Sequence, residues 1–158
     1  MAQQRTSTPY GAFNFQVTAG PIPGSPTSIN AGFQEISGLG MEVTEAEYRT
    51  GNDPTNYVHK ISGLTKATDV TLKRGVMAYL DLANWIKAVR DADYSNFPIT
   101  GTTVTIDLMA EDQSGPVLTY TLTNAKPKSH KGVTLNAKGG TDAAIEEFVL
   151  SVEKIDVS

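Results

Sequence analysis

Apolar and polar residues alternate over most of this chain, which is the pattern of β-strands that turn one face to a core and the other to water. The first such run covers residues 13–17. A second covers about residues 29–35 and a third about residues 42–49, and the turn-forming segment Ser37-Gly38-Leu39-Gly40 lies between them. We expect the second and third strands to form a hairpin.

The third strand carries many charges for a strand in a folded core. Three of its charged residues share the parity of its apolar residue Val43, and they are Glu45, Glu47 and Arg49. Neither side of the strand is therefore a continuous apolar face. This pattern predicts a strand that projects beyond its own domain, with residues 50–56 at the tip and residues 57–61 leading the chain back.

One segment departs from the period of two. After a strand in which Val70 and Leu72 alternate with Thr71 and Lys73, apolar residues recur at the helical spacing i, i+3, i+4 and i+7. These residues are Leu82, Trp85, Ile86 and Val89. The stripe predicts a single helix that lies across a sheet and packs these four side chains into the core.

The last third predicts three more strands. Residues 103–108 and 117–123 alternate on either side of the turn 112–116, and a closing strand covers about residues 147–153. The proline-rich segment 20–26 interrupts the pattern near the start and is expected to be a surface loop. The predicted fold class is mainly β: an antiparallel sandwich or barrel with one flanking α-helix and an extended β-hairpin.

Length and composition favour one domain over residues 1–158, with a flexible amino-terminal arm over residues 1–11. The formal net charge of -4 offers no clustered basic excess for phosphate contacts, so no specific nucleic-acid sequence is expected as a partner. The chain has no cysteine, and no stretch approaches the roughly 20 apolar residues that span a bilayer. We expect a protein made in the cytoplasm, without stable membrane insertion.

The sequence lacks the common catalytic and metal-binding motifs. His59 and His130 lie in no His-x-x-x-His or His-Glu-x-x-His motif, and both are expected to be surface or turn residues. No Gly-x-Ser-x-Gly motif marks a serine nucleophile. The carboxylates of Glu42, Glu45 and Glu47 lack the spacing of a calcium loop and are expected to be solvated or to face another subunit. No enzyme activity, cofactor or metal is therefore expected.

Seven short segments together carry a family signal. They are Phe13-x-Phe15-x-Val17, Gly32-Phe33 through Ser37-Gly38-Leu39, Glu47-Tyr48-Arg49-x-Gly51, Lys60-x-x-Gly63-Leu64-x-Lys66, Leu72-Lys73-Arg74-Gly75, Asn124-Ala125-x-Pro127-Lys128 and Ala144-Ile145-Glu146. In this order and at this spacing they resemble the inner tube proteins of contractile injection systems and the tail tube proteins of contractile phages. The resemblance covers nearly everything from residue 13 to residue 153, although the proline-rich loop is longer than expected for that family.

The resemblance implies hexameric rings that stack into a hollow tube. The partners of this chain would be further copies of itself and the sheath, baseplate and spike proteins, and the lumen would hold cargo. The extended hairpin, residues 43–60, would reach the adjacent ring. Its inter-ring contacts would be Glu45, Glu47, Tyr48, Arg49, Asn52 and Asp53. The polar strand positions that could line the lumen or face the sheath are Thr71, Lys73, Thr103, Thr105 and Asp107.

Other interpretations stay open beside this one. The chain could be the related hexameric tube protein of type VI secretion, whose rings often occur as separate hexamers. It could be a monomeric β-sandwich module that binds a carbohydrate or a protein. It could also be an enzyme whose activity depends on His59 or His130. The sequence does not separate a phage tail from a cellular injection particle, whether cytoplasmic, membrane-anchored or extracellular.

Overall fold

The computed structural model describes residues 7–22, 29–76, 80–91, 101–140 and 142–158. These residues form ten strands and one helix, so the prediction of a mainly β chain is confirmed. The strands are β1 (Phe15–Ala19), β2 (Ile29–Ala31), β3 (Glu35–Ser37), β4 (Met41–Tyr48), β5 (His59–Ala67), β6 (Val70–Gly75), β7 (Thr102–Met109), β8 (Pro116–Lys131), β9 (Ile145–Ser151) and β10 (Lys154–Val157). The helix is α1 (Asp81–Arg90).

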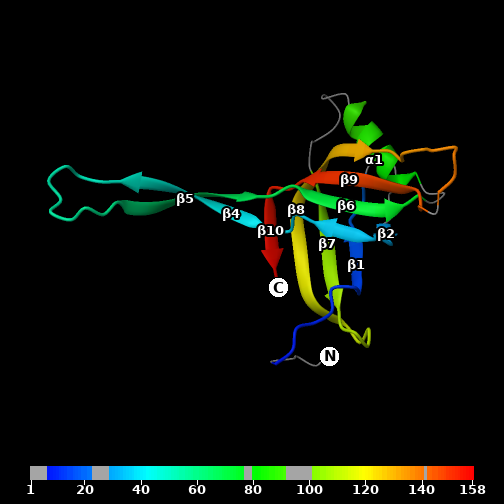
Figure 1. Ribbon diagram of the computed structural model, residues 1–158, viewed down its shortest axis with the longest axis horizontal. Helices are drawn as coiled ribbons and strands as arrows, with labels where there is room; N and C mark the ends of the chain where they lie inside the picture. The colour runs from blue at the N-terminus through cyan, green and yellow to red at the C-terminus, as the bar shows by residue number, and fades with distance from the viewer. Residues whose placement is uncertain (1–6, 23–28, 77–79, 92–100, 141) are drawn as a thin grey trace.

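Strand β8 connects two sheets that run crosswise in Figure 1. Its first part, up to Ala125, pairs with β7 on one side and with β10 on the other. Its second part, from Lys126 on, pairs with β9. The first sheet thus has the order β2-β1-β7-β8-β10, and the second sheet has the order β3-β6-β9-β8. All neighbouring strands are antiparallel, as predicted.

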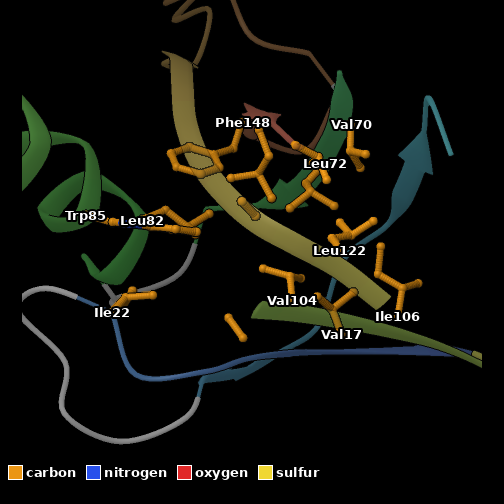
Figure 2. Close-up of a cluster of buried hydrophobic side chains, with 14 of the residues drawn as sticks. Val17, Ile22, Val70, Leu72, Leu82, Trp85, Val104, Ile106, Leu122 and Phe148 are labelled. Carbon is orange, nitrogen blue, oxygen red and sulfur yellow. The ribbon is translucent and has the colours of Figure 1, made fainter. Parts of the chain in front are cut away.

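The core lies between the two sheets and the helix (Figure 2). The expected alternation places Val70 and Leu72 of β6 inside, and Phe148 and Leu150 of β9 beside them. Strands β1, β7, β8 and β10 contribute the remaining strand residues of this core, and they are Val17, Ala19, Val104, Ile106, Leu122, Ala125 and Ile155. Burying a large apolar side chain stabilises the fold by about 1.5 to 3 kcal/mol, so these alternating positions account for much of its stability.

The helix contributes fewer core residues than expected. Leu82 and Trp85 are buried, and the Trp85 ring lies 5.7 Å from the Phe148 ring between centroids. Ile86 packs against the same cluster from a partly exposed position. Val89, however, is 42% exposed, so its assignment to the core is wrong for the isolated chain. It lies one turn further along the helix, past the side chains that form the cluster.

The hairpin expected between residues 29–35 and 42–49 does not form. Residues 29–31 pair with β1, whereas residues 35–37 pair with β6, so the second predicted strand is two short strands in different sheets. The third predicted strand pairs with β5 instead. The turn at Gly38 causes the change: its φ of +84° turns the chain away from the sheet immediately after β3.

Two predicted irregular segments fall partly outside the described residues. These are residues 1–6 of the expected amino-terminal arm and residues 23–26 of the proline-rich loop. The start of that loop is anchored, because the Gly20 amide donates a 2.9 Å hydrogen bond to the carbonyl of Thr103 and Ile22 is buried.

Candidate assembly surfaces

The most conspicuous surface feature is a two-stranded arm that extends away from both sheets (Figure 1). Among the described residues, β4 and β5 pair only with each other. Every residue of β4 is exposed, and so is every residue of β5 except Ala67. The extended hairpin expected from the sequence is therefore present, and it runs from Met41 to Ala67, which is longer at its return end than predicted.

One face of the outer arm is charged. The register pairs Glu45 with Ser62 and Glu47 with Lys60, and directly paired residues share a face of an antiparallel ladder. The Lys60 ammonium lies 3.5 Å from a carboxylate oxygen of Glu45. This face thus carries acidic side chains, one of them already close to a lysine of the same arm.

The opposite face of the outer arm is apolar. There Ala46 pairs with Ile61, and Tyr48 pairs with His59. Tyr48 is 57% exposed and Ile61 is 56% exposed. Other large apolar side chains exposed on the arm are Met41, Val43, Tyr57, Val58 and Leu64. This many exposed large apolar side chains on one arm are typical of an interaction site.

Backbone contact, hydrogen bonds and an ion pair hold the base of the arm against the second sheet. A side chain at Gly38 would place its Cβ 2.1 Å from the carbonyl oxygen of Asp69, so the two backbone segments are in direct contact. The Thr68 hydroxyl donates hydrogen bonds to the carbonyls of Gly38 and Gly40. Asp69 in turn pairs with Lys128 of β8. The arm is therefore positioned by its base and not only by its own ladder.

The tip of the arm is ordered by its own side chains. The Asp53 carboxylate accepts hydrogen bonds from the amide and the hydroxyl of Thr55, at 2.9 Å and 2.7 Å, and lies 3.4 Å from His59. The bond from the Thr55 amide is the main cause of a lowered pKa at Asp53. Arg49 donates to the carbonyl of Thr55 at 3.3 Å. Two of the six residues expected to make inter-ring contacts, Arg49 and Asp53, thus also shape the tip. All six except Asp53 are exposed.

A buried charge cluster lies where β6, β8, β9 and α1 meet. Arg74, which is 4% exposed, follows Val70 and Leu72 on the core face of β6. Its guanidinium donates to Asp81 at 2.7 Å and to Glu146 at 2.5 Å. Burial alone would raise the pKa of Asp81, but the hydrogen bonds and charge of Arg74 outweigh it and the pKa is lowered. The cluster ties the first turn of the helix to the second sheet.

His130 belongs to the same cluster, which corrects its assignment as a surface or turn residue. Its Nε2 lies 2.9 Å from Glu146, and its side chain is 23% exposed. Burial would raise the pKa of Glu146, but the bonds from His130 and Arg74 lower it. His59, by contrast, is exposed on the arm. No group of three or more potential metal-ligating side chains occurs within the described ranges.

The polar positions expected to line a lumen or face a sheath divide between the two sheets. Thr71 and Lys73 lie on the face of the second sheet that points away from the core. Thr103, Thr105 and Asp107 lie on the corresponding face of the first sheet, where Asp107 accepts a 2.6 Å hydrogen bond from Thr119. The structure thus separates the candidates into two sets on different faces of the molecule.

Comparisons with known proteins agree with this architecture. The family model described as T4-like virus tail tube protein gp19 matches residues 11–156. The chain is 25% identical to a chain of the anti-feeding prophage (AFP) baseplate, sixfold symmetrised, with a TM-score of 0.79 and 97% of each chain covered. It is 23% identical to a chain of the PVC sheath-tube complex of an extracellular contractile injection system, with a TM-score of 0.77, 96% of this chain and 93% of that one covered.

More distant structures share the fold with lower similarity. Hcp1 from Flavobacterium johnsoniae is 12% identical, with a TM-score of 0.54 and coverage of 91% of this chain and 94% of that chain. No curated protein sequence matches. The match to the family model spans nearly the whole chain, so this protein belongs to the T4-like virus tail tube protein family, as its sequence segments indicated.

Proposed function

We propose that this chain is the structural subunit of a rigid inner tube, in which six copies form a ring and rings stack into a hollow conduit. Family membership supports this function. The observation that carries it is the arm, which exposes both faces of its ladder and seven large apolar side chains outside the body of its own subunit. Identical neighbours would cover that surface and complete the open sheet edges.

In the proposed tube, the arm makes the contacts between rings. Its apolar face would bury Tyr48 and Ile61 against the adjacent ring, and its charged face would present Glu45 and Glu47. Exposed ion pairs contribute only about 0 to 1 kcal/mol each, so apolar burial supplies most of the affinity and the charges select the register. Asn52 lies at the exposed tip, while Arg49 and Asp53 keep the tip in shape.

The proposed partners are those of a tube inside a contractile particle. The names of the similar structures refer to a sheath-tube complex, a baseplate and a tube terminating cap. We infer that this chain is made in the cytoplasm, meets a sheath, a baseplate and a spike, holds cargo in its lumen and has no enzymatic role. No helix among the described residues is long and apolar enough to span a membrane.

A second candidate function is the hexameric tube protein of type VI secretion. The likeness to Hcp1 and to a second type VI secretion protein, with TM-scores of 0.54 and 0.52, favours it, and the higher TM-scores of the injection-system tubes favour the first candidate. The two differ in assembly: a type VI ring protein would remain as separate hexamers under conditions in which a tail tube subunit forms filaments.

The proposed function is tested by native mass spectrometry of the purified chain over a range of concentrations. We expect an assembly with the mass of six chains and, at higher concentration, multiples of that mass. The double variant Glu45→Lys/Glu47→Lys should keep the six-chain ring but give fewer of the multiples. A chain that remains monomeric at all concentrations would contradict the proposed function and favour the alternative of a β-sandwich binding module.

A further inference from the structure

The apolar and charged residues of the arm exchange faces halfway along its ladder. Strand β4 alternates without interruption, so every second residue lies on the same face of the ladder. One face carries four residues in this order from the base outward: Met41, Val43, Glu45 and Glu47. This face is therefore apolar in the half next to the body and charged in the outer half.

The other face of the ladder has the reverse order. In the half next to the body, Glu42 pairs with Lys66. In the outer half, Ala46 pairs with Ile61 and is followed by Tyr48. A flat ladder would thus show apolar side chains on both of its sides, each over only half of its length.

A β-bulge lies at the point where the faces exchange. The register shifts between Val43 and Glu45. Between them, Thr44 lies opposite two residues, Gly63 and Leu64. The Thr44 hydroxyl donates a 2.9 Å hydrogen bond to the carbonyl of Leu64, and a Cβ at Gly63 would lie 3.0 Å from the carbonyl oxygen of Thr44. A bulge increases the right-handed twist of a ladder, and a two-stranded ladder twists more than a wide sheet.

The twist turns the ladder over between its two halves. Figure 1 shows β4 below β5 near the body and above β5 in the outer half, so the paired strands exchange places in this view. When the strands of a ladder exchange places, the face that was turned toward the viewer is turned away. The exchange of residues and the exchange of strands cancel. The apolar residues of both halves therefore point to one side of the arm, and the charged residues point to the opposite side.

The arm is thus one-sided in space although its ladder is not. We call its apolar side the apolar stripe, which consists of Met41, Val43, Ala46, Tyr48 and Ile61. The four large residues of the stripe are between 50% and 57% exposed. The opposite, charged side consists of Glu42, Glu45, Glu47, Lys60 and Lys66. An arm of this kind fits one partner surface that lies along its whole length.

A second apolar surface lies at the end of the body opposite the arm. Strand β6 runs from the base of the arm to that end, where Gly75 pairs with Ile145 (Figure 1). We call the exposed apolar residues near this point the end patch, and they are Val76, Leu80 and Ile145. Identical subunits that repeat along an axis join one end of a copy to the opposite end of the next copy. Stacking would therefore bring the arm of one copy to the end patch of another.

We propose that the apolar stripe packs against the end patch of a copy in the adjacent ring, and that the charged side of the arm stays in water at the rim of this contact. The proposal rests on the proposed function and adds which side of the arm is buried and which surface receives it. It places Met41 and Val43, which are close to the body, in the same interface as Tyr48 and Ile61. Charges at the rim influence register and salt dependence more than affinity.

Cysteine labelling tests the stripe, because the native chain has no cysteine. Val43→Cys and Glu47→Cys share a face of the ladder, but only Val43 belongs to the stripe. Between unstacked rings at low concentration and tubes, the rate of reaction with N-ethylmaleimide should fall at least about tenfold for Val43→Cys and less than about threefold for Glu47→Cys. On the other face of the ladder, Ile61→Cys should be protected and Lys66→Cys should stay reactive.

The outcomes separate this inference from the proposed function. Equal protection of Val43→Cys and Glu47→Cys in tubes would show that contacts follow the flat faces of the ladder, and it would overturn the stripe. Protection that is already complete in unstacked rings would place the partner within the same ring and would overturn the proposal too. Leu80→Cys reports on the end patch and should be protected in tubes only, so a reactive Leu80→Cys in tubes would refute the receiving surface. If no tube forms, the proposed function itself fails.

Discussion

Arg74 of β6 donates two hydrogen bonds to Asp81 in the first turn of α1, with its Nη2 2.7 Å from Oδ1 and its Nη1 3.2 Å from Oδ2. The same guanidinium bonds to Glu146 of β9. One buried cation therefore joins the helix to the second sheet. Its partners are carboxylates that would lie within the protein without a counter-charge if the arginine were removed.

Truncation of this side chain should destabilise the subunit. Breaking a buried ion pair by removing one partner costs about 3 to 5 kcal/mol, so Arg74→Ala should lower the free energy of unfolding by that amount. Arg74→Lys keeps the charge but not the planar fork and should cost less. Urea denaturation followed by circular dichroism measures both. Arg90→Ala, which removes an exposed ion pair with Asp91, is the control and should leave the midpoint nearly unchanged.

Acid should weaken the same cluster. The pKa values of Asp81 and Glu146 are lowered in the folded chain from their ordinary values of 3.8 and 4.5. The unfolded chain therefore binds more protons than the folded chain in acid. The stabilisation from these carboxylates is complete at a pH above their ordinary pKa values, and it is lost as the pH falls through their lowered pKa values. Urea midpoints between about pH 7 and about pH 3 should fall less steeply for Asp81→Asn/Glu146→Gln than for the native chain. An equal fall of the urea midpoint with pH in the variant and the native chain would show that these carboxylates do not contribute to the loss of stability in acid.

The base of the arm depends on one glycine. Gly38 has a φ of +84° and no room for a Cβ against the backbone of Asp69. Gly38→Ala should therefore lower the free energy of unfolding by at least about 1 to 2 kcal/mol, the cost of a left-handed alanine. Gly51 at the tip is the matched control, because nothing lies within 4 Å of its would-be Cβ. Thermal melts should separate the variants, and equal melting temperatures would contradict the close contact.

The apolar face of the arm should serve assembly without serving the fold. Ile61 is 56% exposed and faces away from the charged side of the arm. Ile61→Asp should melt at nearly the same temperature as the native chain but form tubes far shorter than native ones, as measured by electron microscopy. Ile61→Val keeps the apolar surface and should stack normally. A parallel loss of melting temperature and tube length in Ile61→Asp would assign the residue to folding instead.

Local patterns predicted the elements that depend on local chemistry. Apolar side chains need burial, and their spacing predicted the alternation in β6, β7 and β9 and the helical stripe with Leu82 and Trp85. The structure buries these apolar side chains. The charges of β4 indicated a strand outside the core for the same reason. Strand β10 was not predicted, although Ile155 and Val157 alternate with polar residues, because a run of four residues directly after the expected closing strand is too short to stand out.

The partners of individual residues depend on pairing across long sequence separations, which a local pattern does not contain. Glu146 lies 16 residues from His130 and 72 from Arg74, yet both bond to it. The row of charges on the outer face of the second sheet likewise becomes visible only when four strands are aligned, and it consists of Glu35, Lys73, Glu147 and Lys131. The one local signal of the buried cluster was Arg74, a single charged residue that follows Val70 and Leu72 on the same face of β6.

The most direct test of the tube is electron microscopy of the purified chain in negative stain at high concentration, alone and with the sheath and baseplate proteins proposed as its partners. The proposed function predicts sixfold rings and hollow filaments built from this chain alone, in which identical copies cover the exposed arm and the open sheet edges. Single compact particles under both conditions, with no rings, would contradict the claim that identical copies complete this surface.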